Sequence, residues 1–402
     1  MVVLLIVIYL AFISMGLPSS ILGAIWPVAH LDLGATIKQV GTIFMVVQIS
    51  IVAATLSGNR LINRFSNNKM VMFGLFLISV SLIGYSFSPN YLVIMLFSIP
   101  LGFGIGSIDV SLTSYVSKNF QAKHVNWLQS FWGMGATIGP IIMSLFLANP
   151  GGWRTGYRLI AAIQVLVLII IASTLSLWKN NDLNKVKEKI EQFDSKPKIP
   201  LFKTPFLTIA VISFFLYIAV EHTTGLWASS YLVGHQGFDE VLAARTVSLF
   251  YIGITTGRIL AGFLSIKIKG RNLIRVGQGL IFIGILLMFV NSIQAIAILS
   301  ILIIGLGCAP IFPTMLHESK HRFGTNNLQA IIGLQLSIAY MASIIMQPLF
   351  GQIQQMFGLQ ILPIFILVAL IGTTIFAEKV NYHVYYKKQH NKFKGESKWL
   401  DI

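Results

Sequence analysis

The amino-acid sequence predicts an all-α polytopic membrane protein, with twelve transmembrane helices arranged as two parallel six-helix repeats. Three observations predict this fold. Of the 402 residues, 55% are hydrophobic and 10% are charged, whereas soluble chains are about 25% charged. Apolar runs of about 20 residues, long enough to cross the hydrocarbon core, recur along the chain. Glycine-rich segments of the first half also recur in the second half.

The predicted spans follow one another with short polar connections, such as the single turn SFSPNY. The first span continues through GLPSSILGAIWP, and no basic segment precedes it. We therefore expect a full-length helix there and not a cleaved signal peptide. The predicted spans are residues 3–27, 38–62, 69–88, 91–116, 126–148, 156–178, 204–232, 243–265, 272–291, 293–317, 326–350 and 358–377.

The formal net charge of +16 raises the question of a nucleic-acid partner. Most of the 29 Lys and Arg residues, however, lie in the connections after even-numbered spans and in the C-terminal tail. This asymmetry is the positive-inside pattern, so we expect a multi-pass protein of the plasma membrane with both termini in the cytosol. The pattern explains the basic composition without nucleic acid. The other side carries Lys38, Arg154, Arg158 and Arg245.

A hydrophilic, basic segment divides the chain near its middle. We expect an N-terminal six-helix bundle at residues 1–178, a cytoplasmic linker at 179–203, a C-terminal bundle at 204–377 and a cytoplasmic tail at 378–402. The tail is basic with interspersed aromatic residues. Either it lies on anionic lipid, or it is solvated and enforces the topology.

The two halves carry similar segments at similar places. The stretch GFGIGSIDVSLTSYVSKNF (102–120) aligns with GLGCAPIFPTMLHESKHRF (305–323), and Gly58 aligns with Gly262. This pattern resembles the major facilitator superfamily, whose substrate site lies at the midplane between the halves. The resemblance implies a secondary transporter of a small molecule. We expect a monomer in the lipid bilayer, with no cofactor.

The connection between the second and third spans resembles the signature of the superfamily, a glycine followed by an acidic residue and then basic residues. The segment GNRLINRFSNNK keeps Gly58, Arg64 and Lys69, but Asn63 stands where an aspartate is usual. The resemblance implies a cytoplasmic gate at Gly58, Asn63 and Arg64, with a weakened charge relay. Alternatively, the cations only determine topology.

Within the superfamily, four segments resemble the fucose permease branch, the fucose–galactose–hexuronide proton symporters. They are GIGSID, NWLQSFWGMGA, YIAVEHTTGLWASSYL and IFPTM, in the fourth, fifth, seventh and tenth spans. Two departures leave the sugar open. The first span offers Ser19 and Ser20 where fucose permease has an aspartate, and Trp132 stands where it has an amide.

Two carboxylates lie well inside predicted spans, Asp109 in the first half and Glu221 in the second. A charged residue at a helix centre costs about 2.5–3.5 kcal/mol, so such residues usually face a cavity or a partner. Burial raises the pKa of a carboxyl group, which lets it bind a proton on one side of the membrane and release it on the other. We expect one or both to hold the coupling proton of a sugar importer. Sodium is the alternative coupling ion.

Arg258 is the basic residue that lies well inside a span. It either contributes to gating or is a static counter-ion for one of the carboxylates.

Polar and aromatic side chains in the expected cavity-lining spans are candidates for substrate contact. Amides both donate and accept hydrogen bonds, and flat rings cover the apolar face of a sugar. The alternative is that these residues bond helix to helix or pack, and that His222 modulates the proton affinity of Glu221. The candidates are Gln129, Trp132, His222, Trp227 and Gln335.

Signatures of other classes were sought. No phosphate-binding loop and no Cys/His cluster with metal-ligand spacing is expected, so transport runs on a gradient and we expect no enzyme. Cys308 lies within a span, and His317 and Glu318 lie near the cytoplasmic end of the tenth span, where a solvated loop is favoured. The main rival function is a proton-driven exporter of drugs or metabolites. A weakly polar aromatic cavity favours export, and a cavity rich in amides and hydroxyls favours sugar uptake.

Overall fold

The computed structural model describes residues 2–178, 206–290, 293–324 and 328–397. Over these residues the chain forms helices and short connections. The elements are α1 (Val2–Asp32), α2 (Gln39–Phe65), α3 (Asn67–Phe87), α4 (Tyr91–Asn119), α5 (Ala122–Ser144), α6 (Gly152–Ser173), η1 (Leu175–Leu177), α8 (Leu207–Gly234), α9 (Glu240–Leu264), α10 (Gly270–Met288), α11 (Gln294–Phe323), α12 (Leu328–Phe357), η3 (Leu359–Ile361) and α13 (Leu362–Ser397).

The long helices correspond one by one to the predicted spans. Within the described residues, eleven helices are long and apolar enough to cross a membrane. The remaining long helix is α5, whose first turns carry the polar residues Lys123, His124 and Gln129. The prediction of an all-α polytopic membrane protein is confirmed.

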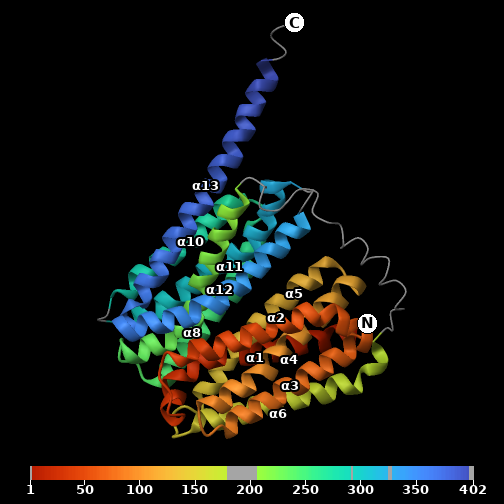
Figure 1. Ribbon diagram of the computed structural model, residues 1–402, viewed down its shortest axis with the longest axis vertical. Coiled ribbons are helices and arrows are strands. Elements are labelled where there is room, and N and C mark those ends of the chain that lie inside the picture. The colour runs from red at the N-terminus through yellow and green to blue at the C-terminus, as the bar shows by residue number, and fades with distance from the viewer. Residues whose placement is uncertain (1, 179–205, 291–292, 325–327, 398–402) are drawn as a thin grey trace.

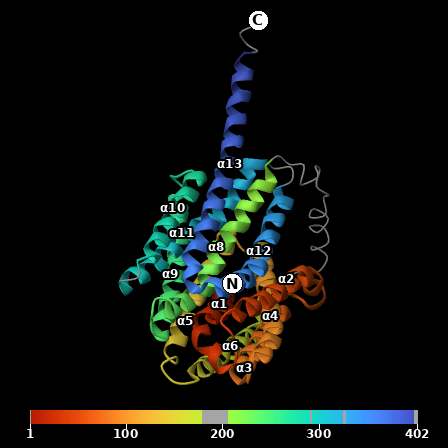
Figure 2. The ribbon, with the colours of Figure 1, turned by 60° about the vertical axis from the view of Figure 1, so that its left-hand side comes forward.

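The helices form two groups that lie side by side, α1–α6 in red to yellow and α8–α13 in green to blue (Figures 1 and 2). In the first group α4 packs against α2 and α3, and in the second group α11 packs against α9 and α10. The two groups meet mainly through α1 with α8, α2 with α12, and α5 with α9.

Aligned glycines explain why the two groups have the same internal packing. In the first group, a Cβ on either Gly74 of α3 or Gly104 of α4 would collide with the carbonyl oxygen of the other glycine. Gly277 of α10 and Gly307 of α11 stand in the same reciprocal relation in the second group. Small residues allow helix backbones to approach closely in membranes. The repeat found in the sequence is therefore a repeat of helix contacts.

The helix boundaries differ from the predicted spans at several ends. The connection expected between the second and third spans reduces to Ser66, which joins α2 to α3 with a φ of 70°. α11 continues to Phe323, six residues beyond the predicted end of its span, and α13 continues through much of the expected tail to Ser397. The expected linker lies outside the described residues.

We name the two ends of the bundle by what they contain. At the contact end, where α1 ends and α2 begins, the groups are joined by direct bonds: Lys38 Nζ donates to Gln355 Oε1 at 2.8 Å, and Ser229 Oγ donates to the Ala24 carbonyl at 2.9 Å. Gly41 also lies directly against the backbone of Gln347. At the opposite end, the basic end, α2 passes into α3 and α13 extends beyond the bundle (Figure 1).

The glycine contacts predict a contrast between two neighbouring positions of α10. Gly277→Ala forces the α10 and α11 backbones apart, so we expect a loss of about 1–3 kcal/mol in stability and a lower melting temperature in detergent. Gly279→Ala is the matched control, because a Cβ there meets no atom within 4 Å. Thermal unfolding of both variants tests this. Equal melting temperatures of the two variants would show that stability does not depend on the close approach of the α10 and α11 backbones.

Candidate functional site

A cavity of about 290 Å³ lies between the two groups of helices. The first group contributes side chains from each of its helices, α1 to α6, and the second group from α8, α9, α11 and α12. The volume is below the usual range for drug-sized ligands. Both intramembrane carboxylates line it, Asp109 from α4 and Glu221 from α8, so the structure brings together residues from the two halves.

Glu221 is buried and lies in a cluster of polar groups. The hydroxyl of Tyr217, one turn earlier on α8, bonds to its carboxylate and also lies 2.7 Å from the carbonyl oxygen of Cys308 on α11. A tyrosine hydroxyl has one hydrogen to donate. When Glu221 is ionised, its carboxylate and the Cys308 carbonyl compete for this hydrogen. When Glu221 is protonated, it can donate to Tyr217 while Tyr217 donates to Cys308, and every partner is satisfied.

Arg258 of α9 faces the same carboxylate at a longer distance. Its Nη2 lies 4.0 Å from Glu221 Oε1, too far for a hydrogen bond. On its other side the guanidinium lies 6.0 Å from the centre of the Trp132 ring, which belongs to α5 in the first group. Tyr251 of α9 contacts Trp132 edge to face, with ring centres 6.5 Å apart. Glu221 is therefore connected across the cavity to the opposite group of helices.

Asp109 is half-buried and has weaker support. Thr113, one turn later on α4, donates to its Oδ1 at 3.3 Å. Tyr340 of α12 lines the same cavity from the second group. Like Glu221, Asp109 thus shares the cavity with side chains of the opposite group.

Two other predicted residues also line the cavity. Gln129 of α5 is exposed there. His222 of α8 bonds through Nδ1 to Ser343 Oγ of α12 at 2.7 Å, and its ring meets Phe44 of α2 edge to face. Because Ser343 also donates to the Ala339 carbonyl at 3.0 Å, the His222 Nδ1 is the donor whenever both bonds form together.

Trp227 and Gln335 lie outside the cavity. Trp227 is fully buried within the second group, where Nε1 donates to Gln347 Oε1 at 3.1 Å and the ring packs on Phe350. Gln335 is buried on α12 and accepts a hydrogen bond from Ser319 Oγ at 2.8 Å. Both residues bond helix to helix, the alternative stated for them above.

The residues expected at the gate lie at the basic end. Gly58 packs against Val110 of α4, the residue next to Asp109, so a side chain at Gly58 would press on the helix that positions this carboxylate. Arg64 is exposed in the last turn of α2, with its guanidinium 5.4 Å from the Phe65 ring. Asn63 also lies in α2, and its side chain is outside the described part of the chain. A gating role for these three residues stays a prediction.

Several lining residues were missed from the sequence. Gln48 lies on the second span, which was not expected to line a cavity, and Ser343, Tyr251 and Tyr340 are residue types that are common in membrane helices. The signal that could have found Tyr340 and Ser343 is the polar run in LQLSIAYMAS, since a helix brings residues three apart to one face.

The expectation for His317 and Glu318 is wrong in one respect. They lie in the last turns of α11, which is helical to Phe323, and not in a loop. His321 follows one turn after His317, and the donor atoms of the three residues lie within 4.8 Å of one another. The described chain therefore does contain a His cluster with metal-ligand spacing, contrary to the expectation.

Comparison with known proteins agrees with the fold. The family model of the Major Facilitator Superfamily matches residues 8–334, and the chain belongs to this superfamily. The glucose/mannose transporter GlcP of Bacillus subtilis is 22% identical over 315 residues, covering 77% of each chain. The glucose/galactose transporter of Brucella abortus is 23% identical over 296 residues, covering 68% of this chain and 69% of the relative.

Solved structures show the same fold. A crystal structure of the D-xylose–proton symporter superposes with a TM-score of 0.72 at 15% identity, covering 92% of this chain and 96% of that one. The inward-open xylose transporter XylE of E. coli gives 0.71 at 14% identity, covering 93% and 95%. The protein is a secondary transporter of the major facilitator fold and not an enzyme.

The placement of two tryptophans predicts different effects of the same substitution. Trp132→Ala removes a cavity wall, so we expect the KM for transport to rise by up to about tenfold with the melting temperature unchanged. Trp227→Ala leaves a void in a packed helix interface, so we expect a lower melting temperature and an unchanged KM. Uptake kinetics and thermal unfolding of both variants check this. A raised KM in Trp227→Ala but not in Trp132→Ala would contradict the placement of Trp132 at the cavity and of Trp227 outside it.

Proposed function

We propose that this protein imports a monosaccharide together with a proton, and that Glu221 holds the proton during the cycle. The observation that carries the proposal is the cavity between the two groups of helices, which combines both intramembrane carboxylates with side-chain types that suit a sugar. The named activities of the relatives and the solved symporters support the choice of a sugar and a proton.

The cavity lining favours a sugar over a hydrophobic drug. Hydroxyl and amide groups face it from both groups of helices, and aromatic rings flank them. Hydroxyls and amides pair with the hydroxyl rim of a sugar, while the rings cover its C–H face. Most of the remaining lining is apolar, so these hydroxyls and amides are the feature that favours a sugar. The uncharged polar lining groups include Ser19, Ser20, Gln48, Gln129, His222 and Ser343, and the rings include Phe44, Trp132, Tyr251 and Tyr340.

The environment of Glu221 supports two charge states. The nearby Arg258 guanidinium stabilises the ionised form, whereas the hydrogen-bond chain through Tyr217 to the Cys308 carbonyl is complete only when Glu221 is protonated. Proton binding releases Arg258 from its counter-charge and leaves it beside Trp132 of the opposite group. A proton therefore changes a contact between the halves, which is the requirement for a ligand to shift the conformational equilibrium.

We further propose that the described conformation faces the cytosol. The bonds between the halves lie at the contact end, and the positive-inside pattern puts the basic end in the cytosol. In this orientation both termini are cytoplasmic. We also propose that the protein is a monomer in the plasma membrane, with the two bundles at residues 1–178 and 204–377.

Removal of the two titratable groups tests the coupling. In proteoliposomes, Glu221→Gln and Asp109→Asn are expected to lose proton-driven accumulation, because an amide cannot exchange a proton. Glu221→Gln should retain sugar counterflow, since Gln imitates the protonated acid. The measurement is internal pH and labelled sugar uptake over a panel of hexoses, deoxyhexoses and uronic acids.

The control and the contrary outcomes are specific. Glu240→Gln, an exposed glutamate in the first turn of α9, is expected to behave as the unmodified protein. Full proton-driven accumulation in both cavity variants would remove the proposed coupling. Accumulation that follows a sodium gradient would replace the proton by sodium, and proton-linked movement of a hydrophobic cation but of no sugar would favour the exporter.

The proposed orientation requires the contact end to open during each cycle. Lys38→Cys combined with Gln355→Cys, joined by a short bifunctional thiol reagent, is expected to abolish uptake by holding that end closed. The chain's single native cysteine, Cys308, is buried and does not compete. The single-cysteine variants treated in the same way are the controls. Normal uptake by the cross-linked protein would show that this end does not open.

A further inference from the structure

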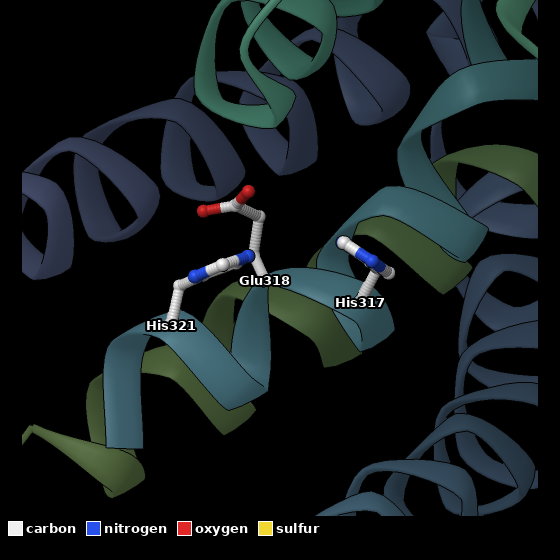
Figure 3. Close-up of side chains that lie close together, drawn as sticks. All are labelled: His317, Glu318 and His321. Carbon is white, nitrogen blue, oxygen red and sulfur yellow. The ribbon is translucent and has the colours of Figure 1, made fainter. Parts of the chain in front are cut away.

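We propose that α11 carries a binding site for a transition-metal dication of intermediate softness, such as Zn²⁺, at the basic end of the bundle. The site is formed by His317, His321 and Glu318. The site is separate from the transport cavity. Its donor atoms all lie within 4.8 Å of one another, and both histidines are exposed while Glu318 is half-buried (Figure 3).

The helix determines the arrangement of the donors. His317 and His321 are four residues apart, so they lie one above the other on the same face of α11, with ring centres 5.7 Å apart. Glu318 is three residues before His321, which places it beside that ring, as Figure 3 shows. Exposed histidine rings can turn about their side-chain bonds, so small rotations bring the nitrogens to the separation that a shared ion requires.

Glu318 is positioned from outside its own helix. Its carboxylate lies against Gly270, where a Cβ would collide with Oε1. Gly270 is the first residue of α10, and the partial positive charge of a helix N-terminus favours a carboxylate beside it. Arg322, the nearest basic residue after His321, bonds to Asn381 of α13 at 2.9 Å. The absent side chain at Gly270 thus leaves room for a carboxylate that is already oriented toward α10.

The chemistry of the donors selects the metal. Two imidazoles and one carboxylate are a ligand set of four-coordinate protein sites for Zn²⁺ in which water takes the fourth position. Mg²⁺ and Ca²⁺ prefer oxygen ligands and bind imidazole poorly. A bound ion would join His317 and His321 to Glu318 of the same helix, whose carboxylate lies beside the first residue of α10.

The test is a calorimetric titration of the tag-free, full-length protein in detergent with ZnCl₂. We expect one ion bound per chain at this site, no competition by MgCl₂, and binding at least about tenfold weaker in His317→Ala and in His321→Ala. His235→Ala is the matched control, because His235 is an exposed histidine at the contact end. Glu318→Gln should also weaken binding.

Each outcome is decisive. Equal melting temperatures of the metal-free variants establish that the alanine substitutions leave the fold intact, since alanine is a strong helix former. Unchanged Zn²⁺ affinity in both His317→Ala and His321→Ala would overturn the site, and so would a wild-type titration without binding. Loss of binding in His235→Ala alone would assign the ion to a different histidine.

Discussion

A carboxylate buried between membrane helices is the constraint on which the rest of this structure depends. Two protein groups stabilise the charge of Glu221, the Tyr217 hydroxyl and the Arg258 guanidinium, while the Cys308 carbonyl competes with the ionised carboxylate for the tyrosine hydrogen. A charged group in this position is costly unless partners or a cavity offset the lost hydration. Arg258 approaches the carboxylate to 4.0 Å, and so loose a contact opposes a change of charge less than a tight ion pair would.

The glycine contacts restrict where motion can occur. Within each half, α3 with α4 and α10 with α11 touch backbone to backbone, so these pairs have little freedom to slide. Between the halves, backbone contacts such as Gly41 against Gln347 are accompanied by side-chain contacts, such as Lys38 to Gln355 and Arg258 beside Trp132. Under the proposed transport cycle, the contacts between the halves at the contact end are the ones that must separate.

Much of the fold could be predicted from the sequence, because the membrane imposes span length, apolar composition and charge asymmetry. The glycine repeat also anticipated real helix contacts. The ends of helices were harder to predict, because a helix that leaves the membrane has no hydropathy signal at its end. Helix α11, for example, continues through polar residues to Phe323. That extension placed His317 and His321 on one helix face, which the expectation of a loop had concealed.

The candidate site could be predicted only in part. Asp109 and Glu221 stand out because charge is rare in spans, and both line the cavity. Trp227 lies on α8, a helix that lines the cavity, yet the side of α8 on which it lies faces Phe350 and not the cavity. Periodicity cannot decide this in a helix that is apolar on all sides, since each face is buried against a different neighbour.

The most direct test of the role of Glu221 is an infrared difference spectrum of the purified protein between acidic and alkaline pH, with and without sugar. A protonated carboxylic acid has its own C=O stretching band. This band should be present in the unmodified protein and in Glu240→Gln, shift in frequency in Tyr217→Phe, and disappear in Glu221→Gln. An identical band in Glu221→Gln would show that Glu221 does not exchange the proton and would contradict the central claim.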